Sequence, residues 1–315
     1  MQAPDDKIIS QSRPATEPAD WDIDQARLSF HRAASDYEEH AWLQQEVGGR
    51  LLERLDELNT QPQTVVDMGC GTGLHSLALK TRYPKAEVVG IDFAEGMLTQ
   101  AKKRNSWRRK VEYRQADMGN CGLADASVDL LYSNFSLQWA VDLRSVFNEW
   151  RRIMKPNGLL LFTTLGPGTL LELRQAWEKV DNNAHVNDFI DIRDVGDALV
   201  SAGFYEPVMD AEMLTLTYSS VHKLMRELKG MGAHNVNHQR QHGLTGAGRM
   251  RAMCTAYKDF RLPDGRYPAS WEVIYGVAWQ PEDGQPVRTI TGEEASFSVE
   301  HLLNSRKNKP RKNKS

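Results

Sequence analysis

The sequence predicts an α/β fold with a doubly wound, mostly parallel sheet, and three observations lead to it. Between residues 64 and 164, short apolar runs alternate with segments whose apolar residues recur at helical spacing. The first apolar run, 64–68, leads into a glycine-rich loop and then into a helical segment. Such alternation is typical of parallel strands that are joined by right-handed crossovers, with helices on both faces of the sheet.

The strands and helices of this core follow in a regular order. Apolar runs bounded by turn residues predict strands at 64–68, 87–92, 111–116, 128–133 and 159–164. The periodic segments between them predict helices at 74–83, 94–104 and 143–154. Before the first strand, residues 23–58 have helical spacing that is interrupted at Gly48 and Gly49. We therefore expect one or two amphipathic helices there, broken at these glycines.

The alternation loosens beyond Leu165, where the sequence predicts an elaboration of the same domain. We expect helices at 169–180 and 192–202, and strands at 213–218 and 271–279. Between these two strands lies an insertion, residues 219–269, whose two ends have helical spacing at 221–229 and 245–260. A helical cap of this kind on a nucleotide-type sheet usually holds the substrate.

The charges are unevenly distributed along the chain. Its 315 residues include 39 Lys and Arg and 42 Asp and Glu, which gives a formal net charge of -3. Residues 304–315 contain six basic side chains and no acidic one, so the part before them is more acidic than the total suggests. We predict a mobile leader at 1–20, one domain at 21–303 that includes the cap, and a basic disordered tail at 304–315.

Cysteine content and hydropathy exclude several classes of protein. Cys70, Cys121 and Cys254 are far apart and have no CxxC or Cys–His spacing, which indicates reduced thiols and no metal site. No apolar run reaches the ~20 residues of a membrane span, and the N-terminus lacks the features of a signal peptide. We therefore expect a cytoplasmic monomer that binds neither membranes nor nucleic acid.

The sharpest motif is the glycine loop at 69–73, with the sequence G-C-G-T-G after the first strand. Its glycines, Gly69, Gly71 and Gly73, follow a G-x-G-x-G pattern, whereas a dinucleotide fingerprint needs its third glycine one position later. Glycines let the backbone approach a ligand closely, and the N–H groups that open the next helix favour a phosphate or a carboxylate. Asp67, just before the loop, is placed to attract an ammonium group directly or through water.

Two further strand ends complete a predicted cofactor site. Asp92 ends the second strand, where an acidic side chain typically hydrogen-bonds both ribose hydroxyls. Asp117 and Met118 follow the third strand and supply an acceptor for an exocyclic amine beside an apolar surface for a purine. Together the three loops fit an adenosine that carries an amino acid. Because nothing in the motif requires a pyrophosphate, we predict S-adenosylmethionine rather than NAD.

From about Tyr37 to Leu165 the sequence resembles class I S-adenosylmethionine-dependent methyltransferases. That family has a seven-stranded sheet with an antiparallel last strand, which residues 271–279 are expected to supply. More narrowly, the chain from Phe30 onward resembles the malonyl-acyl-carrier-protein O-methyltransferases of biotin synthesis. The segments that carry this resemblance are 30–37 (FHRAASDY), 133–139 (SNFSLQW), 162–165 (FTTL), 173–177 (LRQAW), 228–233 (LKGMGA), 243–245 (GLT) and 265–268 (GRYP). The leader and the basic tail do not share in this resemblance.

The resemblance implies a reaction that requires little of the protein. Members of that family methylate the free carboxylate of a malonyl thioester on acyl carrier protein, which masks a charge so that fatty-acid synthase elongates the chain. A malonyl carboxylate has a pKa well below 7 and is already a nucleophile, so no general base is needed. What remains is in-line placement, exclusion of water and a weak counter-charge.

The resemblance also implies which residues form the transfer site. Tyr37 matches a tyrosine that helps to close over the cofactor, and Asn134, after the fourth strand, is expected to border the methyl group. Gln138 and Trp139 are expected to line the substrate pocket. Lys229 is the favoured partner of the substrate carboxylate, because it opens a family-like turn. The other candidates for this role are Arg174, Arg226 and His234.

Other interpretations remain open. The same cofactor site would serve a methyltransferase that acts on another small carboxylic acid, a CoA thioester or a quinone. A second alternative is a noncatalytic relative that binds the cofactor and acts as an assembly factor. Cys70 is expected to be a small side chain beside the cofactor, since no adjacent His would activate it.

An acidic carrier protein requires a local basic face on this chain. Three groups of cations are candidates for that face. They are Arg249, Arg251, Lys258, Arg261 and Arg266 around the cap; Lys102, Lys103, Arg104, Arg108, Arg109 and Lys110; and the tail.

Overall fold

The computed structural model describes most of the chain between residues 19 and 294. The described residues are 19, 21–232, 235–237, 245–282, 284–285, 287–289 and 292–294. Almost all of the predicted leader and the whole basic tail lie outside these residues, and so does His234.

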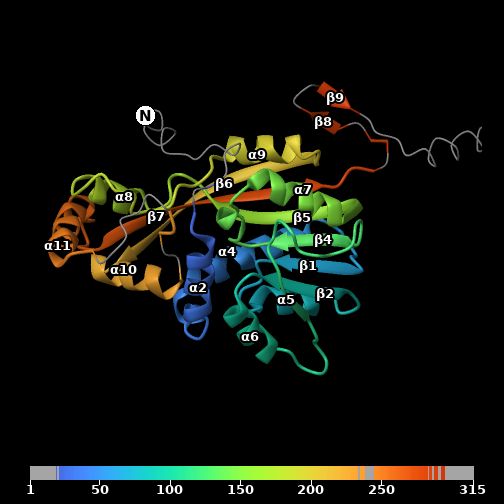
Figure 1. Cartoon of the computed structure of the whole chain (residues 1–315), viewed down its shortest axis with the longest axis horizontal. Coiled ribbons are helices and arrows are strands. Elements are labelled where there is room, and N and C mark those ends of the chain that lie inside the picture. Colours follow the sequence, from blue (N-terminus) through green and yellow to red (C-terminus); the bar gives the residue numbers. More distant parts are fainter. Residues whose placement is uncertain are drawn as a thin grey trace, which may run out of the picture.

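A seven-stranded sheet forms the centre of the fold, as Figure 1 shows. Its strands stand in the order β3-β2-β1-β4-β5-β7-β6. Their bounds are β1 Thr64–Met68, β2 Glu87–Asp92, β3 Glu112–Gln115, β4 Val128–Ser133, β5 Met154–Leu165, β6 Tyr205–Tyr218 and β7 Tyr267–Trp279. The first five strands pair in parallel, whereas β7 is antiparallel to both β5 and β6. The predicted α/β class and the antiparallel last strand are therefore confirmed.

Helices cover both faces of this sheet. The bounds of the helices around the parallel strands are α4 Trp42–Glu53, α5 Leu74–Arg82, α6 Glu95–Lys103, α7 Leu143–Ile153 and α9 Ile192–Ser201. On α7 the apolar side chains recur at helical spacing, and Val146, Phe147, Trp150 and Ile153 are all buried against one face. Leu43, Val47 and Leu51 of α4 pack in the core on the other face. The predicted crossover helices agree with these bounds to within about two residues.

The N-terminal helical region differs from the prediction in where it breaks. It consists of α2 (Ile23–Ala33), the short α3 (Tyr37–His40) and α4, which runs through Gly48 and Gly49 without interruption. A Cβ atom on Gly48 would lie 2.2 Å from the His75 ring and 2.8 Å from Asn134 Nδ2. Gly48 is therefore needed for close packing, and the predicted break at these glycines was wrong.

The last two strands are longer than predicted and project beyond the parallel strands. The predicted strand 213–218 is the end of β6, which begins at Tyr205, and β7 begins four residues before the predicted Trp271. β7 pairs with β5 only as far as Val273, while its pairing with β6 continues to Tyr267. The β6–β7 ribbon thus extends past the sheet. A short hairpin, β8 (Val287–Thr289) with β9 (Gly292–Glu294), was not predicted.

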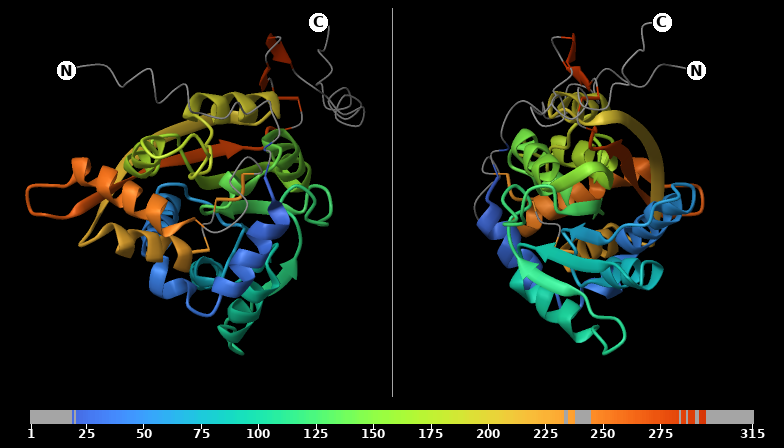
Figure 2. Two further views of the ribbon diagram at one scale, coloured as in Figure 1. Left: turned by 60° about the vertical axis from the view of Figure 1, so that its left-hand side comes forward. Right: turned by 90° about the vertical axis from the view of Figure 1, so that its right-hand side faces the viewer.

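The predicted cap is built around the projecting end of this ribbon. The predicted residues 219–269 contain α10 (Val221–Gly230), α11 (Ala247–Ala256) and the 3-10 turn η3 (Tyr257–Phe260). A helix from outside that range, α8 (Leu171–Glu178), packs against α11 and η3. These elements gather at one end of the molecule in Figures 1 and 2, with α2 between them and the parallel strands. Among the described helices, none combines the length and the apolar character needed to cross a bilayer.

Candidate active site

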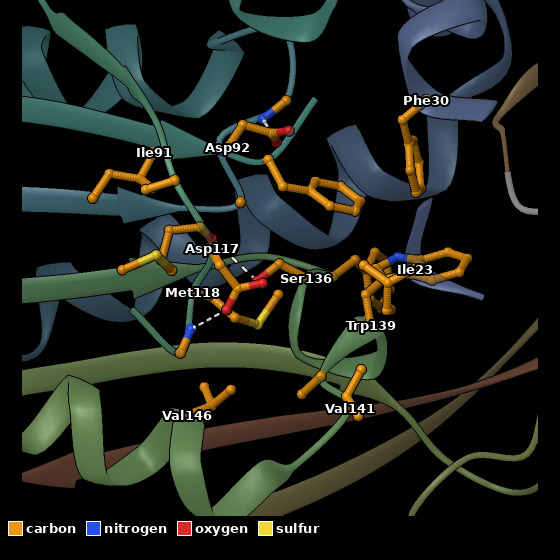
Figure 3. Close-up of a pocket in the computed structure, with 18 of the residues that line it drawn as sticks. Ile23, Phe30, Ile91, Asp92, Asp117, Met118, Ser136, Trp139, Val141 and Val146 are labelled. Carbon is orange, nitrogen blue, oxygen red and sulfur yellow. Dashed lines mark hydrogen bonds between the residues drawn. The ribbon is translucent and has the colours of Figure 1, made fainter. Parts of the chain in front are cut away.

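The first cavity lies at the carboxyl ends of the parallel strands, beside the point where strand order reverses between β1 and β4. It has a volume of about 330 Å³ and is shown in Figure 3. Of the residues predicted to bind the cofactor, six line it: Gly69, Gly71, Asp92, Asp117, Met118 and Asn134. Asp67, Cys70 and Gly73 do not line this cavity.

The glycine loop is shaped by backbone conformations that favour glycine. Gly69, Gly71 and Gly73 have φ angles of 74°, 53° and 78°. A Cβ atom on Gly69 would lie 2.2 Å from Ser136 Cβ, and one on Gly73 would lie 2.4 Å from the Tyr113 hydroxyl. No heavy atom lies within 4 Å of the position that a Cβ on Gly71 would take. Gly71 therefore leaves open space at the cavity wall, whereas Gly69 and Gly73 allow close packing.

Asp92 is the buried carboxylate of this cavity. Its Oδ2 accepts a hydrogen bond from the Gly71 amide at 2.9 Å, and its Oδ1 accepts one from the Ala94 amide at 2.8 Å. Burial raises the pKa of Asp92 to about 6, although these backbone hydrogen bonds act in the opposite direction. The carboxylate is thus fixed between the glycine loop and the start of α6, and retains lone pairs for a ligand hydroxyl.

Asp67 lies deeper, within the protein interior. Its Oδ2 accepts a hydrogen bond of 2.5 Å from the Ser76 hydroxyl, and only 2% of its surface is exposed. Burial raises its pKa to about 7. The side chain is therefore tied to α5 and does not reach the cavity that we expected it to serve.

The residues that follow the third strand, Asp117 and Met118, also line the cavity. Asp117 is exposed, and its Oδ1 accepts a hydrogen bond from the Gly119 amide at 2.7 Å. Met118 lies beside it, and its carbonyl accepts a hydrogen bond from Trp150 Nε1. Figure 3 shows both side chains at the same side of the cavity as Val146. An acceptor beside an apolar surface is thus present where the sequence predicted a purine contact.

A second cavity of about 460 Å³ lies between the first cavity and the cap. Four aromatic residues line both cavities: Phe30, Tyr37, Phe135 and Trp139. The rings of Phe30 and Trp139 meet edge to face with centroids 5.1 Å apart, and those of Phe30 and Tyr37 lie 6.5 Å apart. Burial and the nearby Asp92 raise the pKa of Tyr37 far above its ordinary value, so its hydroxyl stays protonated. The two cavities therefore share an aromatic wall.

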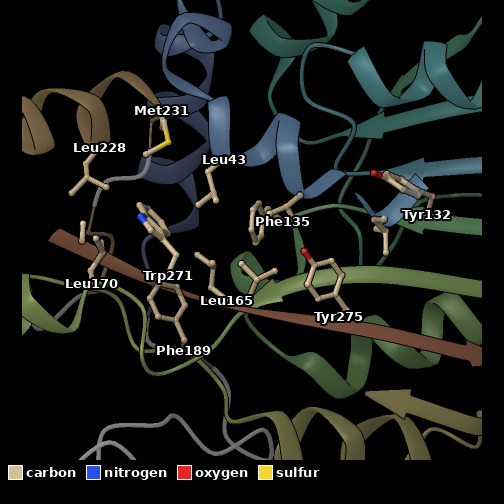
Figure 4. Close-up of a cluster of buried hydrophobic side chains, with 14 of the residues drawn as sticks. Leu43, Tyr132, Phe135, Leu165, Leu170, Phe189, Leu228, Met231, Trp271 and Tyr275 are labelled. Carbon is tan, nitrogen blue, oxygen red and sulfur yellow. The ribbon is translucent and has the colours of Figure 1, made fainter. Parts of the chain in front are cut away.

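The second cavity is largely apolar but contains polar groups at defined points. Apolar side chains of the core line much of it, as Figure 4 shows for Leu43, Leu165, Leu170 and Trp271. Three buried atoms of its lining side chains have no hydrogen-bond partner in the described structure. They are Trp271 Nε1, Gln44 Oε1 and Gln138 Oε1. Because buried polar atoms usually have partners, these atoms indicate a ligand that carries polar groups.

Asn134 connects the first cavity to the N-terminal helices. Its Nδ2 donates to the Gln44 carbonyl at 2.9 Å, and its Oδ1 accepts from the Thr163 hydroxyl at 2.8 Å. The same hydroxyl oxygen accepts a hydrogen bond from the Phe135 amide. Asn134 thus borders the cavity while its amide group holds α4 against the ends of β4 and β5.

Glu38, next to Tyr37, ties α3 to the glycine loop. Its Oε1 accepts a hydrogen bond of 2.6 Å from the Thr72 hydroxyl and forms an ion pair with Arg104. Arg104 Nε in turn donates to the Thr72 carbonyl at 2.9 Å. These three residues form a clasp between α3, the glycine loop and the end of α6.

Comparisons with known proteins identify the family. A family model described as a methyltransferase domain matches residues 66–162. A malonyl-[acyl-carrier protein] O-methyltransferase of Xylella fastidiosa is 43% identical over 91% of this chain and 98% of its own length. A protein of the same name from Methylovorus is 47% identical over 82% of this chain and 90% of its own length. This chain belongs to the malonyl-[acyl-carrier protein] O-methyltransferase family.

A solved structure supports the fold of this family member. The crystal structure of YcgJ protein from Bacillus subtilis covers 74% of this chain and 98% of its own length, with a TM-score of 0.53 and 16% identity. That similarity concerns the fold alone. Together with the matched family model and the strand order, it shows a class I methyltransferase fold.

The substrate residues expected in the malonyl-[acyl-carrier protein] O-methyltransferase family are only partly brought together. Gln138, Trp139 and Lys229 line the second cavity. Arg174 does not; its guanidinium donates to Asp188 Oδ1 at 3.1 Å and to the Asn187 carbonyl at 2.9 Å. Arg226 is exposed on α10 and does not line the cavity. His234 lies outside the described residues.

Sequence reasoning missed several residues of the site. Phe30 and Phe135 belong to segments that resembled the family, yet neither was predicted to line the cavities. Trp271 was expected only as the start of a strand. Nothing in the local sequence distinguishes such aromatic residues from ordinary core side chains. In the part of the chain that the structure describes, no group of three or more Cys, His, Asp or Glu is placed to hold a metal ion.

Proposed function

We propose that this protein transfers a methyl group from S-adenosylmethionine to the free carboxylate of a malonyl thioester on acyl carrier protein. The observation that carries this proposal is the pair of cavities with a shared aromatic wall, one at the strand ends and one beneath the cap. Two ligands that exchange a single carbon must meet at such a boundary. The family names of the relatives supply the identity of the acceptor.

The residues of the first cavity fit the proposed cofactor. Gly71 leaves unoccupied space for a close approach to the backbone, and Asp92 presents a fixed carboxylate suited to ribose hydroxyls. Asp117 and Met118 supply an acceptor and an apolar contact for the adenine. When bound, S-adenosylmethionine supplies an electrophilic methyl group on a sulfonium centre.

The chain's own contribution at the second cavity is placement and exclusion of water. The apolar wall shields the acceptor, which raises the reactivity of a carboxylate that needs no deprotonation. The protonated Tyr37 hydroxyl offers a hydrogen bond near the boundary, and Lys229 offers charge at the far end. Gln138 Nε2 already donates to the Phe135 carbonyl at 2.7 Å, which leaves its second N–H for a ligand. Neutral donors leave one carboxylate lone pair free to react, whereas a tight bidentate ion pair would occupy it.

Polar groups along the second cavity favour a thioester over a plain hydrocarbon acid. The Trp271 indole N–H is a donor, while Gln44 Oε1 and Gln138 Oε1 are acceptors, and none has a partner within the described protein. A thioester carbonyl and the amides of a pantetheine arm carry the complementary groups. This match supports an acceptor attached to such an arm.

Labelled methyl transfer tests the proposal directly. The purified protein is incubated with S-adenosylmethionine labelled in the methyl group and with malonyl-, succinyl- or acetyl-acyl carrier protein. We expect base-labile label on the malonyl carrier and little on the other two. Equal labelling of the succinyl carrier, or no label on any carrier, would overturn the proposed substrate.

A further inference from the structure

The second cavity reaches the surface at the cap. Among its described lining residues, only Lys229 of α10 and Thr245, just before α11, are exposed. Met225 and Met250, from the same two helices, are half-buried beside them. The opposite end of the cavity is closed by buried side chains such as Phe135 and Leu165. The mouth of this cavity therefore lies between α10 and α11.

Positive charge is concentrated around this mouth. The described residues between 219 and 261 include seven Lys and Arg but only two Asp and Glu, although the whole chain has more acidic than basic residues. Asp259 pairs with Lys179 and Arg249 pairs with Asp181 at 3.5 Å, whereas Glu227 accepts a hydrogen bond from the neutral Tyr218 hydroxyl and keeps its charge. This segment therefore carries a net positive charge on a protein whose formal net charge is negative.

Several of these cations have no carboxylate partner. Within the described residues, no ion pair involves Arg226 or Lys229 of α10, Arg251 of α11 or Lys258 of η3, and all four side chains are exposed. Arg251 directly follows the cavity-lining Met250, and Lys258 lies two helical turns further on. We name these four residues the basic face.

We propose that the basic face is the docking site of the acyl carrier protein, whose arm enters the second cavity between α10 and α11. This inference rests on the proposed function for the identity of its partner. Acyl carrier proteins are strongly acidic, so the sign of the charge is complementary, and long-range attraction would orient the carrier above the mouth. An arm that enters there carries the malonyl group toward the aromatic wall.

The other basic groups of the chain are less suited to this role. Lys102, Lys103 and Arg104 lie at the end of α6, and Arg104 is already held in the clasp with Glu38. Neither these residues nor those at 105–110 line the second cavity. Figure 1 shows α6 well separated from α10 and α11. A carrier bound at α6 would therefore present its arm far from the mouth.

Charge reversal tests the docking site. The double variant Arg251→Glu/Lys258→Glu is compared with Lys102→Glu/Lys103→Glu, which changes the net charge equally on exposed residues elsewhere. With malonyl-acyl carrier protein at low salt, we expect kcat/KM to fall about tenfold or more in the first variant and to stay within about twofold in the second. With the malonyl thioester of N-acetylcysteamine, which has no carrier, both variants should match the parent.

Direct binding separates this inference from the proposed function. The Kd for carrier protein that bears the arm without a malonyl group is measured by fluorescence anisotropy, and we expect it to rise about tenfold only in Arg251→Glu/Lys258→Glu. An unchanged Kd and an unchanged kcat/KM in that variant would overturn the docking site while leaving the methyl transfer intact. If the double variant loses carrier binding while the parent methylates no malonyl thioester, the docking site is supported and the proposed function is contradicted.

Discussion

Lys229 lines the second cavity from its exposed end, while Lys223 on the same helix does not line it. We predict that Lys229→Ala raises the KM for the malonyl substrate about tenfold, because a cation at the mouth through which the negatively charged substrate enters is lost; this corresponds to ~1.4 kcal/mol. The Kd for S-adenosylmethionine should not change, since Lys229 is absent from the first cavity. Steady-state kinetics and calorimetry measure the two effects. Equal effects in Lys223→Ala would contradict the role of Lys229.

Asp67 binds its proton more tightly in the folded protein than in the unfolded chain. Its pKa is about 7 in the folded state, whereas an unfolded Asp loses its proton near ~3.9. The folded state therefore holds more protons between these values, and the contribution of Asp67 to the free energy of unfolding falls as the pH rises from about 4 to 7. His75, whose pKa burial lowers to about 4, contributes a change of opposite sign between about pH 4 and 6.5.

The variant Asp67→Asn isolates this effect. At each pH, the free energy of unfolding of the variant is compared with that of the parent. We predict that the variant gains on the order of 1–3 kcal/mol relative to the parent between pH 4 and pH 8, because only the parent loses the contribution of Asp67. The amide oxygen still accepts the hydrogen bond from Ser76, and His75 is common to both proteins. Urea titrations at several pH values measure the difference. A difference that is constant with pH would show that Asp67 titrates normally.

For single residues, the sequence predicts the positions of side chains at strand ends well and contacts in the interior poorly. Gly71, Asp92 and Asp117 follow strands whose ends meet at one edge of the sheet, so their convergence follows from the topology. Arg174 could not be placed in the same way, because its partner Asp188 is fourteen residues away in an irregular segment. The direction of Asp67 into the interior likewise depends on Ser76, on the next helix.

Among the elements, α4 offers a matched pair of glycines. Gly48 faces His75 and Asn134, whereas no heavy atom lies within 4 Å of the position of a Cβ on Gly49. We predict that Gly48→Ala destabilises the protein by about 1–3 kcal/mol, since the clash requires the packed side chains to move. Gly49→Ala should stabilise it by about 0.5–1 kcal/mol, because glycine is the poorer helix former. Thermal or urea unfolding measures both, and the same sign in both variants would contradict this packing.

The β6–β7 ribbon shows why element lengths were harder to predict than their order. Buried parallel strands are short apolar runs, which are visible in a single sequence. In β6, buried or half-buried side chains alternate with exposed ones over much of its length, and the sequence before Met213 includes Pro207, Asp210 and Glu212. Continuous pairing with β7 from Val208 to Tyr218, beyond an irregularity after Tyr205, stabilises this polar segment as a strand. Tertiary context, rather than local preference, thus sets its start.

At the scale of the whole molecule, binding of a ligand to the folded state should raise the free energy of unfolding. We predict that S-adenosylhomocysteine at 100 times its Kd stabilises the fold by about 2.7 kcal/mol, with a corresponding rise in Tm. In Asp92→Asn the rise should be largely lost, because the amide is a weaker partner for ribose hydroxyls than a carboxylate is. Differential scanning fluorimetry measures both proteins with and without ligand. The Tm of the unliganded variant separates weaker binding from misfolding, and a full rise in the variant would contradict the role of Asp92.

The two cavities open at different places on the molecule. Among the residues that the structure describes, the exposed ones that line the first cavity are Asp117, Asn120, Val141 and Ser145, whereas those of the second are Lys229 and Thr245. Neither ligand therefore has to pass through the site of the other, and both can be present when the sulfonium methyl carbon and the carboxylate oxygen meet where the two cavities adjoin, beside Phe30, Tyr37, Phe135 and Trp139. Such an arrangement favours sequential kinetics through a ternary complex, with no compulsory order of addition. The spent nucleoside would then compete with fresh cofactor for its own cavity and not with the incoming carrier.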